Sequence, residues 1–418
     1  MLATPSGWLD ADAEPVAKRV FSLPEPLCPE CSGRFFGKLG HGLSNVQRWQ
    51  RVLERVSESE VPAPVTTGCS LCGGAFQRMD QWVRRVLDRV AGYEWHTFLC
   101  GSRWGPEVLA LEESLWTQVG SRWGESIRTA FNREFGKALA VATGGVAQQE
   151  SQDIVFLADV PAGQIELTIA SLYFRGRYRK LDRTIPQTRW PCRECRGRGC
   201  RRCSGTGKMY ATSVEELIAG PLNTLAQGQG HRFHGMGRED IDARMLGRGR
   251  PFVAEVLSPR IRTLDLPTAV AEITRGASGR VEVLGLTPCS ALDVRKVKEE
   301  KHDKSYRVLV RGNVGEEKII EAVNFLSGCE LVQRTPVRVA HRRADLKRRR
   351  SIKEMRMTEK GEGMFTLEIR AEAGTYIKEL ITGDGGRTQP SFSDIVGAPL
   401  EVVSLDVLDI HDEEEESW

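Results

Sequence analysis

Apolar residues recur at helical spacing in two segments near the N-terminus. The first set is Val46, Trp49, Val52, Leu53 and Val56, and the second is Trp82, Val83, Val86, Leu87 and Val90. Since positions three and four apart share one face of a helix, each set predicts an amphipathic helix. The first helix should end before the proline-rich segment 61–65, and Asp80 should lie near the start of the second. Such stripes are more typical of core packing than of a ligand-binding surface.

Apolar and polar residues alternate along residues 153–160 and 164–174, on either side of a turn at Pro161–Gly163. Alternation with a period of two is typical of strands, so the two segments predict a β-hairpin. The second strand should lead directly into a segment rich in arginine.

The remainder of the chain is mostly strand-like. Ser213–Glu216 has the pattern of a capping box and predicts a helix that ends near Gly220 and Pro221. Strands are expected at residues 281–286, 306–311, 318–323, 364–371 and 402–410, with few and short helices between them. This order favours an α+β domain built on a mixed, largely antiparallel sheet.

Size and composition allow two or three such domains. The chain has 418 residues, and 40% of them are hydrophobic, which is enough for a core in each domain. No internal repeat is evident.

The net charge of +3 conceals a strong segregation of charge. Residues 175–208 carry twelve Lys or Arg against Asp182 and Glu194, and residues 341–350 carry six against Asp345. Solvated charged faces would explain most such runs. Two dense arginine blocks, the first interleaved with Tyr178 and Trp190, fit phosphate binding better and indicate a nucleic-acid partner. The chain ends in the acidic run 412–416.

The cysteines point to metal. The N-terminal residues contain no apolar signal region, and no segment has the length of a membrane span, so we expect a cytoplasmic protein with no membrane partner. Disulfides are rare in that compartment. Eight of the eleven cysteines form CxxC pairs, namely Cys28 with Cys31, Cys69 with Cys72, Cys192 with Cys195, and Cys200 with Cys203.

Two CxxC turns complete the four-thiolate shell of a structural zinc ion, which leaves no open position for catalysis. The turns at 192–203 would form a compact knuckle, whereas the first two pairs must be joined across the long loop 32–68. Pairing between the two halves, or a redox role for one CxxC turn, is also open. Three further cysteines, Cys100, Cys289 and Cys329, stand alone and are expected to be buried apolar residues.

Three separated segments carry candidate chemistry. Residues 237–240 (GRED) place Asp240 in a basic turn that begins with glycine, residues 304–307 (KSYR) supply Tyr306, and residues 374–380 (GTYIKEL) supply Tyr376 and Lys378. Taken singly, the aspartate fits a turn residue, the tyrosine a strand residue and the lysine a surface residue. In this order, they resemble the catalytic-aspartate, tyrosine and third motifs of the pseudouridine synthases.

The resemblance is closer to one family. Residues 185–203, 207–218 and 237–252 are similar to the archaeal Pus-ten tRNA pseudouridine synthases, and similarity extends over nearly the whole chain. The resemblance implies isomerisation of uridine in the T-loop of tRNA, at positions 54 and 55, without an organic or nucleotide cofactor. It also implies an accessory RNA-binding domain at residues 1–190 with a THUMP-like region, a zinc knuckle at 191–208, and a pseudouridine synthase fold at 209–418.

The same resemblance implies roles for individual residues. Asp240 would be the nucleophile, at C1′ of the sugar or at C6 of uracil, and Tyr306 would stack on the flipped base. Lys378 would hold Asp240 ionised and oriented, with less definite geometry than an arginine. Asp242 and Tyr376 are the rivals of Asp240 and Tyr306. Substrate contacts are expected from Arg238, Arg244, Arg248, Arg250, Tyr376, Arg348, Arg349 and Arg350.

Two other function classes fit part of the pattern. Another THUMP-bearing tRNA-modifying enzyme should carry a nucleotide- or methyl-donor-binding loop, but residues 247–249 supply only a GxG fragment. A non-catalytic zinc-ribbon RNA-binding protein would use the knuckle without Asp240. We expect a monomer that acts on the T-arm of tRNA.

Overall fold

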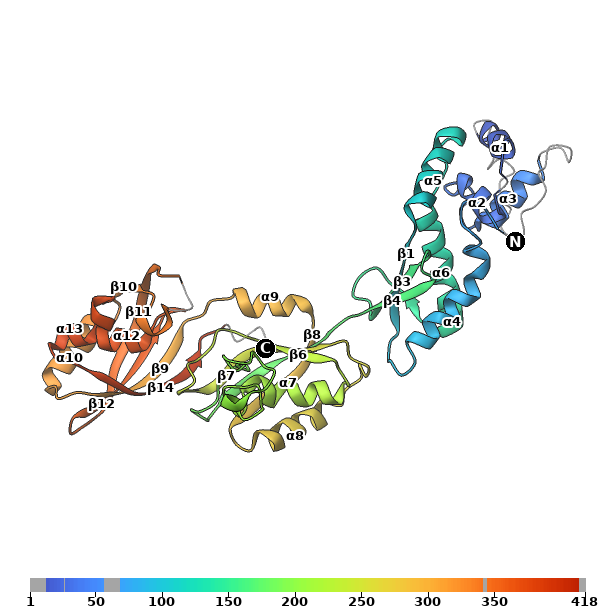
Figure 1. The fold of residues 1–418 in the computed structure, drawn as a ribbon. Helices are drawn as coiled ribbons and strands as arrows, with labels where there is room; N and C mark the ends of the chain where they lie inside the picture. The colour runs from blue at the N-terminus through green and yellow to red at the C-terminus, as the bar shows by residue number, and fades with distance from the viewer. Residues whose placement is uncertain (1–12, 26, 56–67, 341–343, 413–418) are drawn as a thin grey trace. The chain divides into compact units, whose positions relative to one another are not determined.

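The computed structural model describes residues 13–25, 27–55, 68–340 and 344–412. The chain folds as two compact units, Met1–Ala170 and Ser171–Trp418 (Figure 1). The segment 61–65, at which the first helix was expected to stop, and residues 413–416 of the acidic run lie outside the described residues.

The first unit combines a small sheet with helices. Its sheet has the order β2-β1-β3-β4, in which β1 is parallel to both β2 and β3 while β3 and β4 form an antiparallel hairpin. The strands are β1 (Thr97–Arg103), β2 (Val146–Ala147), β3 (Ile154–Asp159) and β4 (Gln164–Ile169). The helices are α1 (Glu14–Phe21), α2 (Pro29–Gly33), α3 (Asn45–Leu53), α4 (Met79–Arg89), α5 (Pro106–Val119) and α6 (Ile127–Thr143).

Both amphipathic helices are confirmed as α3 and α4. The hydroxyl of Ser44 caps α3 by accepting a hydrogen bond from the main-chain amide of Gln47. In turn, the side-chain oxygen of Gln47 accepts a hydrogen bond from the main-chain amide of Ser44. Trp49 and Val52 of α3 and Trp82 and Val86 of α4 are buried in the core of the first unit, as expected from their spacing.

The second unit is built on a sheet of ten strands with the order β13-β10-β11-β12-β9-β14-β7-β5-β8, and β6 pairs with β7. The strands are β5 (Leu172–Lys180), β6 (Gly230–Gly235), β7 (Ala243–Leu257), β8 (Val281–Cys289), β9 (Lys304–Arg311), β10 (Glu330–Arg334), β11 (Lys347–Gly361), β12 (Met364–Ala371), β13 (Thr388–Gln389) and β14 (Glu401–Ile410). The helices are α7 (Val214–Leu225), α8 (Leu266–Ala277), α9 (Ala291–Glu299), α10 (Glu316–Leu326), α11 (Val337–Ala340), α12 (Ile377–Thr382) and α13 (Phe392–Val396).

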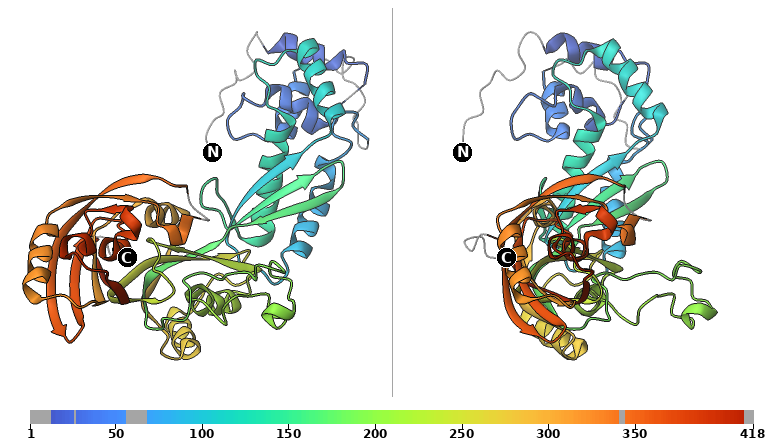
Figure 2. Two further views of the ribbon diagram at one scale, coloured as in Figure 1. Left: turned by 60° about the vertical axis from the view of Figure 1, so that its left-hand side comes forward. Right: turned by 90° about the vertical axis from the view of Figure 1, so that its left-hand side faces the viewer.

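The expected α+β class and largely antiparallel sheet are confirmed. Among the described strands of the large sheet, only β14 and β7 pair in parallel. Two apolar cores form on this sheet. In one, α7 and α8 pack together beside β5 to β8, and in the other α10, α12 and α13 lie beside β9 to β12 (Figures 1 and 2).

Three details of the expected elements were wrong. Residues 318–323 form part of helix α10 instead of a strand, because Ile319, Ala322, Val323 and Leu326 recur at helical spacing and are all buried. The capping box of Ser213 does open α7, but the helix continues through Pro221 to Leu225. Burial of Leu222 in the core beyond the proline explains the longer helix. Helices are also more numerous in this region than expected.

The two units meet at Ala170 and Ser171, whereas the sequence-based division placed the boundary at residue 190. The expected long second strand of the hairpin ends at Ile169, and Leu172 begins β5, which lies between β7 and β8 in the large sheet. Main-chain pairing on both sides therefore places the start of the arginine-rich segment inside the second unit.

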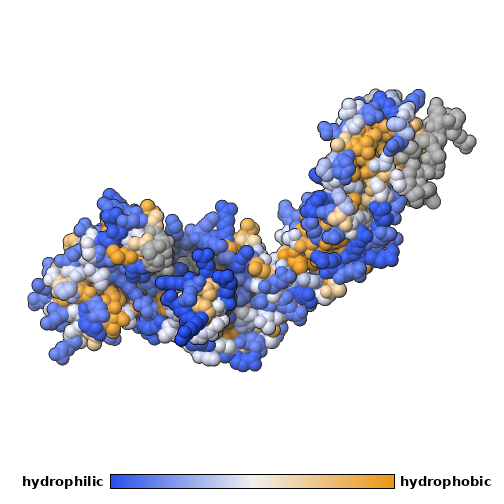
Figure 3. All heavy atoms as spheres, viewed as in Figure 1, coloured by the Kyte–Doolittle hydropathy of each residue, from blue (hydrophilic) through white to orange (hydrophobic). Residues whose placement is uncertain are grey.

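Hydrophilic side chains cover most of the second unit on the face seen in Figure 3. Within the part of the chain that the structure describes, every helix is too short or too polar to cross a membrane.

Candidate active site and cysteine clusters

Asp240 lies in the loop that joins β6 to β7. Gly237 opens this loop with a φ of +75°, a conformation that favours glycine. The amide of Ala243 donates to the Asp240 carbonyl at 3.1 Å, which closes the turn just before β7 begins.

A buried lysine fixes the main chain of the loop. The Lys180 ammonium donates to the carbonyl oxygens of Asp240 at 3.2 Å, Ile241 at 2.7 Å and Ile185 at 3.0 Å. Its side chain is fully buried, and burial lowers the pKa of Lys180. Three carbonyl partners use all three donors of an ammonium group, so Lys180 acts as a positioning residue for the turn.

The neighbouring acid, Glu239, is held by buried partners. Glu239 is buried, accepts from the Arg250 Nε at 2.9 Å and accepts from the Tyr178 hydroxyl at 3.1 Å. Arg250 also donates to the Met236 carbonyl at 2.6 Å. These hydrogen bonds hold the side-chain directions of the buried pair, Glu239 and Arg250, and both residues line the same cavity as Asp240.

The cavity beside Asp240 has a volume of about 280 Å³. All three sequence motifs contribute to its wall, because Asp240, Tyr306, Tyr376 and Lys378 line it together. Its further lining includes Arg238, Glu239, Arg250, Lys304, Arg338, Gly374 and Leu405. The fold therefore brings together residues that lie far apart along the chain.

Two cations contact the Asp240 carboxylate. The Nη1 of Arg338 lies 2.9 Å from Oδ2, and the Nζ of Lys378 lies 3.6 Å from the same oxygen. The closer cation, Arg338, comes from the short helix α11 and is also bound by Glu379, with 2.6 Å between Nε and Oε1. Sequence reasoning assigned only Lys378, since nothing in the local sequence around Arg338 marks it.

Asp242 has a different environment. Both of its carboxylate oxygens accept from Lys378, at 2.9 and 2.7 Å. Burial raises the pKa of Asp242, but the bonds from Lys378 outweigh it and hold the pKa below its usual value. Its side chain is 67% exposed, and it does not line the cavity that holds Tyr306. Asp240 is thus the carboxylate that faces the aromatic wall.

Tyr306 and Lys304 lie on the same face of β9, since they are two residues apart in a strand. Tyr306 is buried, and desolvation raises its pKa to about 12, so its hydroxyl stays neutral at ordinary pH. Burial lowers the pKa of Lys304 to about 8, with a further lowering by Arg250. No carboxylate among the described residues forms an ion pair with Lys304, whose ammonium donates to the His302 carbonyl at 3.4 Å and whose side chain lines the cavity.

The residues expected to contact the substrate lie at different distances from the cavity. Tyr376 lines the cavity, and its main chain is held by Gln333, which both accepts from its amide and donates to its carbonyl at 2.9 Å. Arg238 is exposed at the cavity rim. Arg244 instead binds Asp406 through two hydrogen bonds, at 3.1 and 2.7 Å.

The arginines of β11 do not share one direction. Alternation along the strand places Arg349 on the face opposite to Arg348 and Arg350. Arg348 donates to the Thr335 hydroxyl at 3.1 Å, and the guanidinium of Arg350 lies next to Gly374 in the cavity wall. Arg349 is highly exposed.

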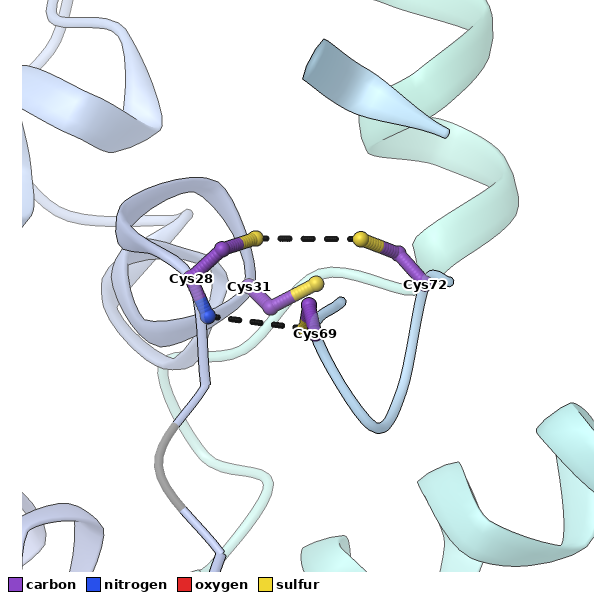
Figure 4. A group of neighbouring side chains, drawn as sticks. All are labelled: Cys28, Cys31, Cys69 and Cys72. Atoms are coloured by element: carbon purple, nitrogen blue, oxygen red, sulfur yellow. Dashed lines mark hydrogen bonds between the residues drawn. The ribbon is translucent and has the colours of Figure 1, made fainter. Parts of the chain in front are cut away.

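The first cysteine cluster joins α2 to the turn before α4 (Figure 4). Cys28 and Cys31 face Cys69 and Cys72, and the sulfurs of Cys28 and Cys72 are 3.7 Å apart. Four thiolates around a tetrahedral zinc ion at about 2.3 Å would be separated by about 3.8 Å, so the spacing fits such an ion. All four cysteines are buried and belong to the core of the first unit.

The second cluster consists of Cys192, Cys195, Cys200 and Cys203, with neighbouring sulfurs 3.8 to 3.9 Å apart. Main-chain amides of Gly199 and Gly207 donate to its sulfurs at 3.2 Å, as expected for groups that carry thiolate charge. A side chain at Gly207 would place its Cβ 2.3 Å from the Gly197 carbonyl, so only glycine fits there. The two halves of the chain therefore form separate clusters, and each can hold a metal.

Comparison with known proteins agrees with this arrangement. The model described as Pus10, C-terminal, matches residues 173–411, and the archaeal Pus10 THUMP domain matches residues 82–159. The chain belongs to the Pus10 family.

Curated Pus10 relatives match over nearly their whole length. The tRNA pseudouridine synthase Pus10 of Methanothermobacter marburgensis is 44% identical over 92% of this chain and 95% of that protein. Its namesake from Methanothrix thermoacetophila is 39% identical over 96% and 95%, and that from Archaeoglobus fulgidus is 42% identical over 82% and 95%. The resemblance inferred from the three motifs is confirmed.

Proposed function

We propose that this Pus10 chain isomerises uridine to pseudouridine in the T-loop of tRNA, at position 54, position 55 or both. Support comes from family membership together with one geometric observation: the carboxylate of Asp240 and the ring of Tyr306 line the same cavity, with cations around the carboxylate. A folded loop hides the reacting atoms of uridine, so the base must be flipped into this cavity.

The reaction needs no external reagent. The bond between C1′ and N1 breaks, a bond between C1′ and C5 forms, C5 loses a proton and N1 gains one. Asp240 supplies the nucleophile, at C1′ or at C6, and the ion pairs with Arg338 and Lys378 orient its carboxylate. Tyr306 stacks on the base and limits its escape, which is worth on the order of 1 to 3 kcal/mol.

Lys304 has a separate task in this proposal. The detached uracil carries negative charge on N1 and its carbonyl oxygens, and the Lys304 ammonium in the cavity wall can stabilise that charge. The position of Lys304 on the Tyr306 face of β9 supports this role.

The two cysteine clusters are proposed to hold structural zinc, since four thiolates leave no open position on the ion. The chain is further proposed to act as a monomer in the cytoplasm, where its tRNA substrate matures. Arg238 and Arg350 are the arginines placed best for phosphates that flank the flipped nucleotide, because Arg238 lines the cavity and Arg350 lies next to Gly374 of its wall.

The decisive experiment compares two aspartate variants on unmodified tRNA, with chemical mapping of pseudouridine. Asp240→Asn keeps the shape of the side chain but removes its charge. We expect turnover to fall at least about 1000-fold, or ~4 kcal/mol in activation free energy, while tRNA affinity stays within a few fold. Asp242→Asn is the matched control and should retain more than about a tenth of the activity.

Variants of the surrounding groups sharpen the assignment. Tyr306→Leu should slow the reaction severely through lost stacking. Lys378→Met and Arg338→Met each remove a charged contact to Asp240 and should cost roughly 10- to 100-fold. If Asp242→Asn is inactive while Asp240→Asn is not, the nucleophile is Asp242. If both variants stay active, this cavity is not the site of the reaction.

A further inference from the structure

A second cavity of about 260 Å³ lies next to the first. It shares Arg238, Asp240, Arg338 and Lys378 with the catalytic cavity, and its outer wall is formed by Trp190 and Tyr210. Neither aromatic residue belongs to one of the three sequence motifs. A group held in this second cavity would lie directly beside the uridine held in the first.

The base of the cysteine knuckle creates the aromatic pair. Residues 191–208 project from the body of the second unit as a lime-green segment in the right-hand view of Figure 2. At its base the chain pairs with itself, through an antiparallel bridge between Pro191 and Lys208 and a 2.9 Å hydrogen bond from the Met209 amide to the Trp190 carbonyl. This pairing sets Trp190 and Tyr210 side by side, with ring centroids 5.6 Å apart and planes at 81°.

The base is also tied to helix α7. The Arg189 amide donates to Glu215 at 2.9 Å, and the Lys208 ammonium forms a 2.6 Å ion pair with Glu216. The aromatic pair is therefore held from both sides, by the second cysteine cluster and by α7. Rigid positioning of this kind lowers the entropy cost of binding a partner.

The chemistry of the second cavity matches a nucleotide. The two rings meet edge to face and do not stack on each other, and the Arg238 guanidinium lies over the Trp190 ring. Aromatic rings and guanidinium planes are both groups on which a base can stack. The guanidinium carbon of Arg238 lies 5.8 Å from the centre of the Trp190 ring. Arg338 and Lys378 also line the cavity, together with Asp240 and Asp242, to which they are ion-paired. Unpaired bases in RNA loops are commonly held by aromatic side chains, with cations on the neighbouring phosphates.

We propose that this second cavity binds the base of a nucleotide adjacent to the target uridine, with the base stacked on Trp190 or Tyr210 and Arg238 directed at the linking phosphate. The inference rests on the proposed function, because the catalytic cavity must hold the target uridine. It gives the second cysteine cluster a purpose beyond local stability, since the cluster holds the two ends of the knuckle that carry the aromatic residues.

The test uses the full chain with Asp240→Asn and T-arm hairpin RNAs that carry 2-aminopurine at one loop position at a time. The fluorescence of 2-aminopurine falls when it stacks, so the RNA with the probe beside the target should be quenched on binding. Adding Trp190→Ala should remove that quenching and weaken binding roughly 5- to 150-fold, whereas Trp190→Phe should keep both. Phe325→Ala, an exposed aromatic residue of α10, is the matched control and should change neither.

A second measurement uses the chain with Asp240 intact. An RNA with an abasic nucleotide beside the target should be isomerised more slowly, and Trp190→Ala should add little to that loss because both changes remove one interaction. The proposed subsite would be overturned if the abasic RNA and Trp190→Ala reduced the rate independently and additively. It would also be overturned if 2-aminopurine were quenched at no position next to the target. If Trp190→Ala does not fold, equal rates for the abasic and complete RNA would overturn it. An intact chain that fails to isomerise the complete hairpin would instead refute the proposed function.

Discussion

The two cysteine clusters share a ligand set but differ in their surroundings. Cys28, Cys31, Cys69 and Cys72 are at most 3% exposed and pack among apolar residues such as Leu27 and Phe35. Cys200 and Cys203 of the second cluster are half-buried, and none of its cysteines belongs to an apolar core of the second unit. The first cluster is part of a core, and the second holds a projecting segment.

The contrast shows that two clusters built from the same CxxC turns can have different surroundings. The first cluster connects segments far apart in the sequence and so contributes to the folding of a whole unit. The second connects residues within one short segment, whose base carries the pair Trp190 and Tyr210. Removal of each cluster should therefore be detected by different measurements.

The largest expected effect comes from Cys31→Ser. Loss of zinc from a core site removes a free energy of folding on the order of 10 kcal/mol, so the first unit should unfold. Limited proteolysis should degrade the described part of residues 13–170 while it leaves residues 171–412 intact, and elemental analysis should show one zinc fewer per chain. A protease-resistant first unit in this variant would contradict a structural role for the cluster.

Cys195→Ser should have a smaller and more local effect. We expect the melting transition of the second unit to remain, while kcat/KM falls roughly 5- to 150-fold through weaker RNA binding, the loss expected for one stacking interaction. Steady-state kinetics on unmodified tRNA measure it. Cys329→Ser, a lone cysteine on the same unit, is the control and should retain full activity; a similar defect in both variants would argue against a role for the knuckle.

A chelator should distinguish the clusters by rate. Because two of its sulfurs are partly exposed, the second cluster should release its metal about tenfold faster than the buried first cluster, which must open locally to do so. Native mass spectrometry during chelation should show a species with one metal and weakened RNA binding. Simultaneous loss of both ions would mean that the clusters do not differ in accessibility.

The smallest expected effect is a change of activity with pH, which depends on the proposed catalytic cavity and on neither cysteine cluster. Burial lowers the pKa of Lys304 to about 8, with Arg250 lowering it and Asp303 raising it. The cation is present below that pKa and is lost above it, so kcat/KM should fall several fold between pH 7 and pH 9. Zinc content should stay constant over this range. Lys304→Met should be slower at pH 7 and should lack this decline; an unchanged decline would assign it to another group.

The sequence determined the chemistry of the protein more completely than its architecture. Motif spacing selected Asp240, Tyr306 and Lys378 as candidate site residues, and the structure places all three in the wall of one cavity. The four CxxC turns predicted the clusters, because two thiolates separated by two residues can share one ion whatever the surrounding fold. Alternation and helical spacing predicted α3, α4, β12 and the hairpin, since these patterns depend on neighbours along the chain.

Only the tertiary structure decided which partners meet across long separations. Arg338 contacts Asp240 because α11 follows β10 at the cavity edge, and no local pattern records that contact. Lys180 holds the turn of Asp240 from the end of β5, a strand whose first residues, 172–174, were expected to belong to the hairpin of the first unit. Residues 318–323 became helix α10 because burial of one helical face outweighed their strand-like composition. Trp190 and Tyr210 meet because the knuckle between them closes, which depends on main-chain pairing at its base.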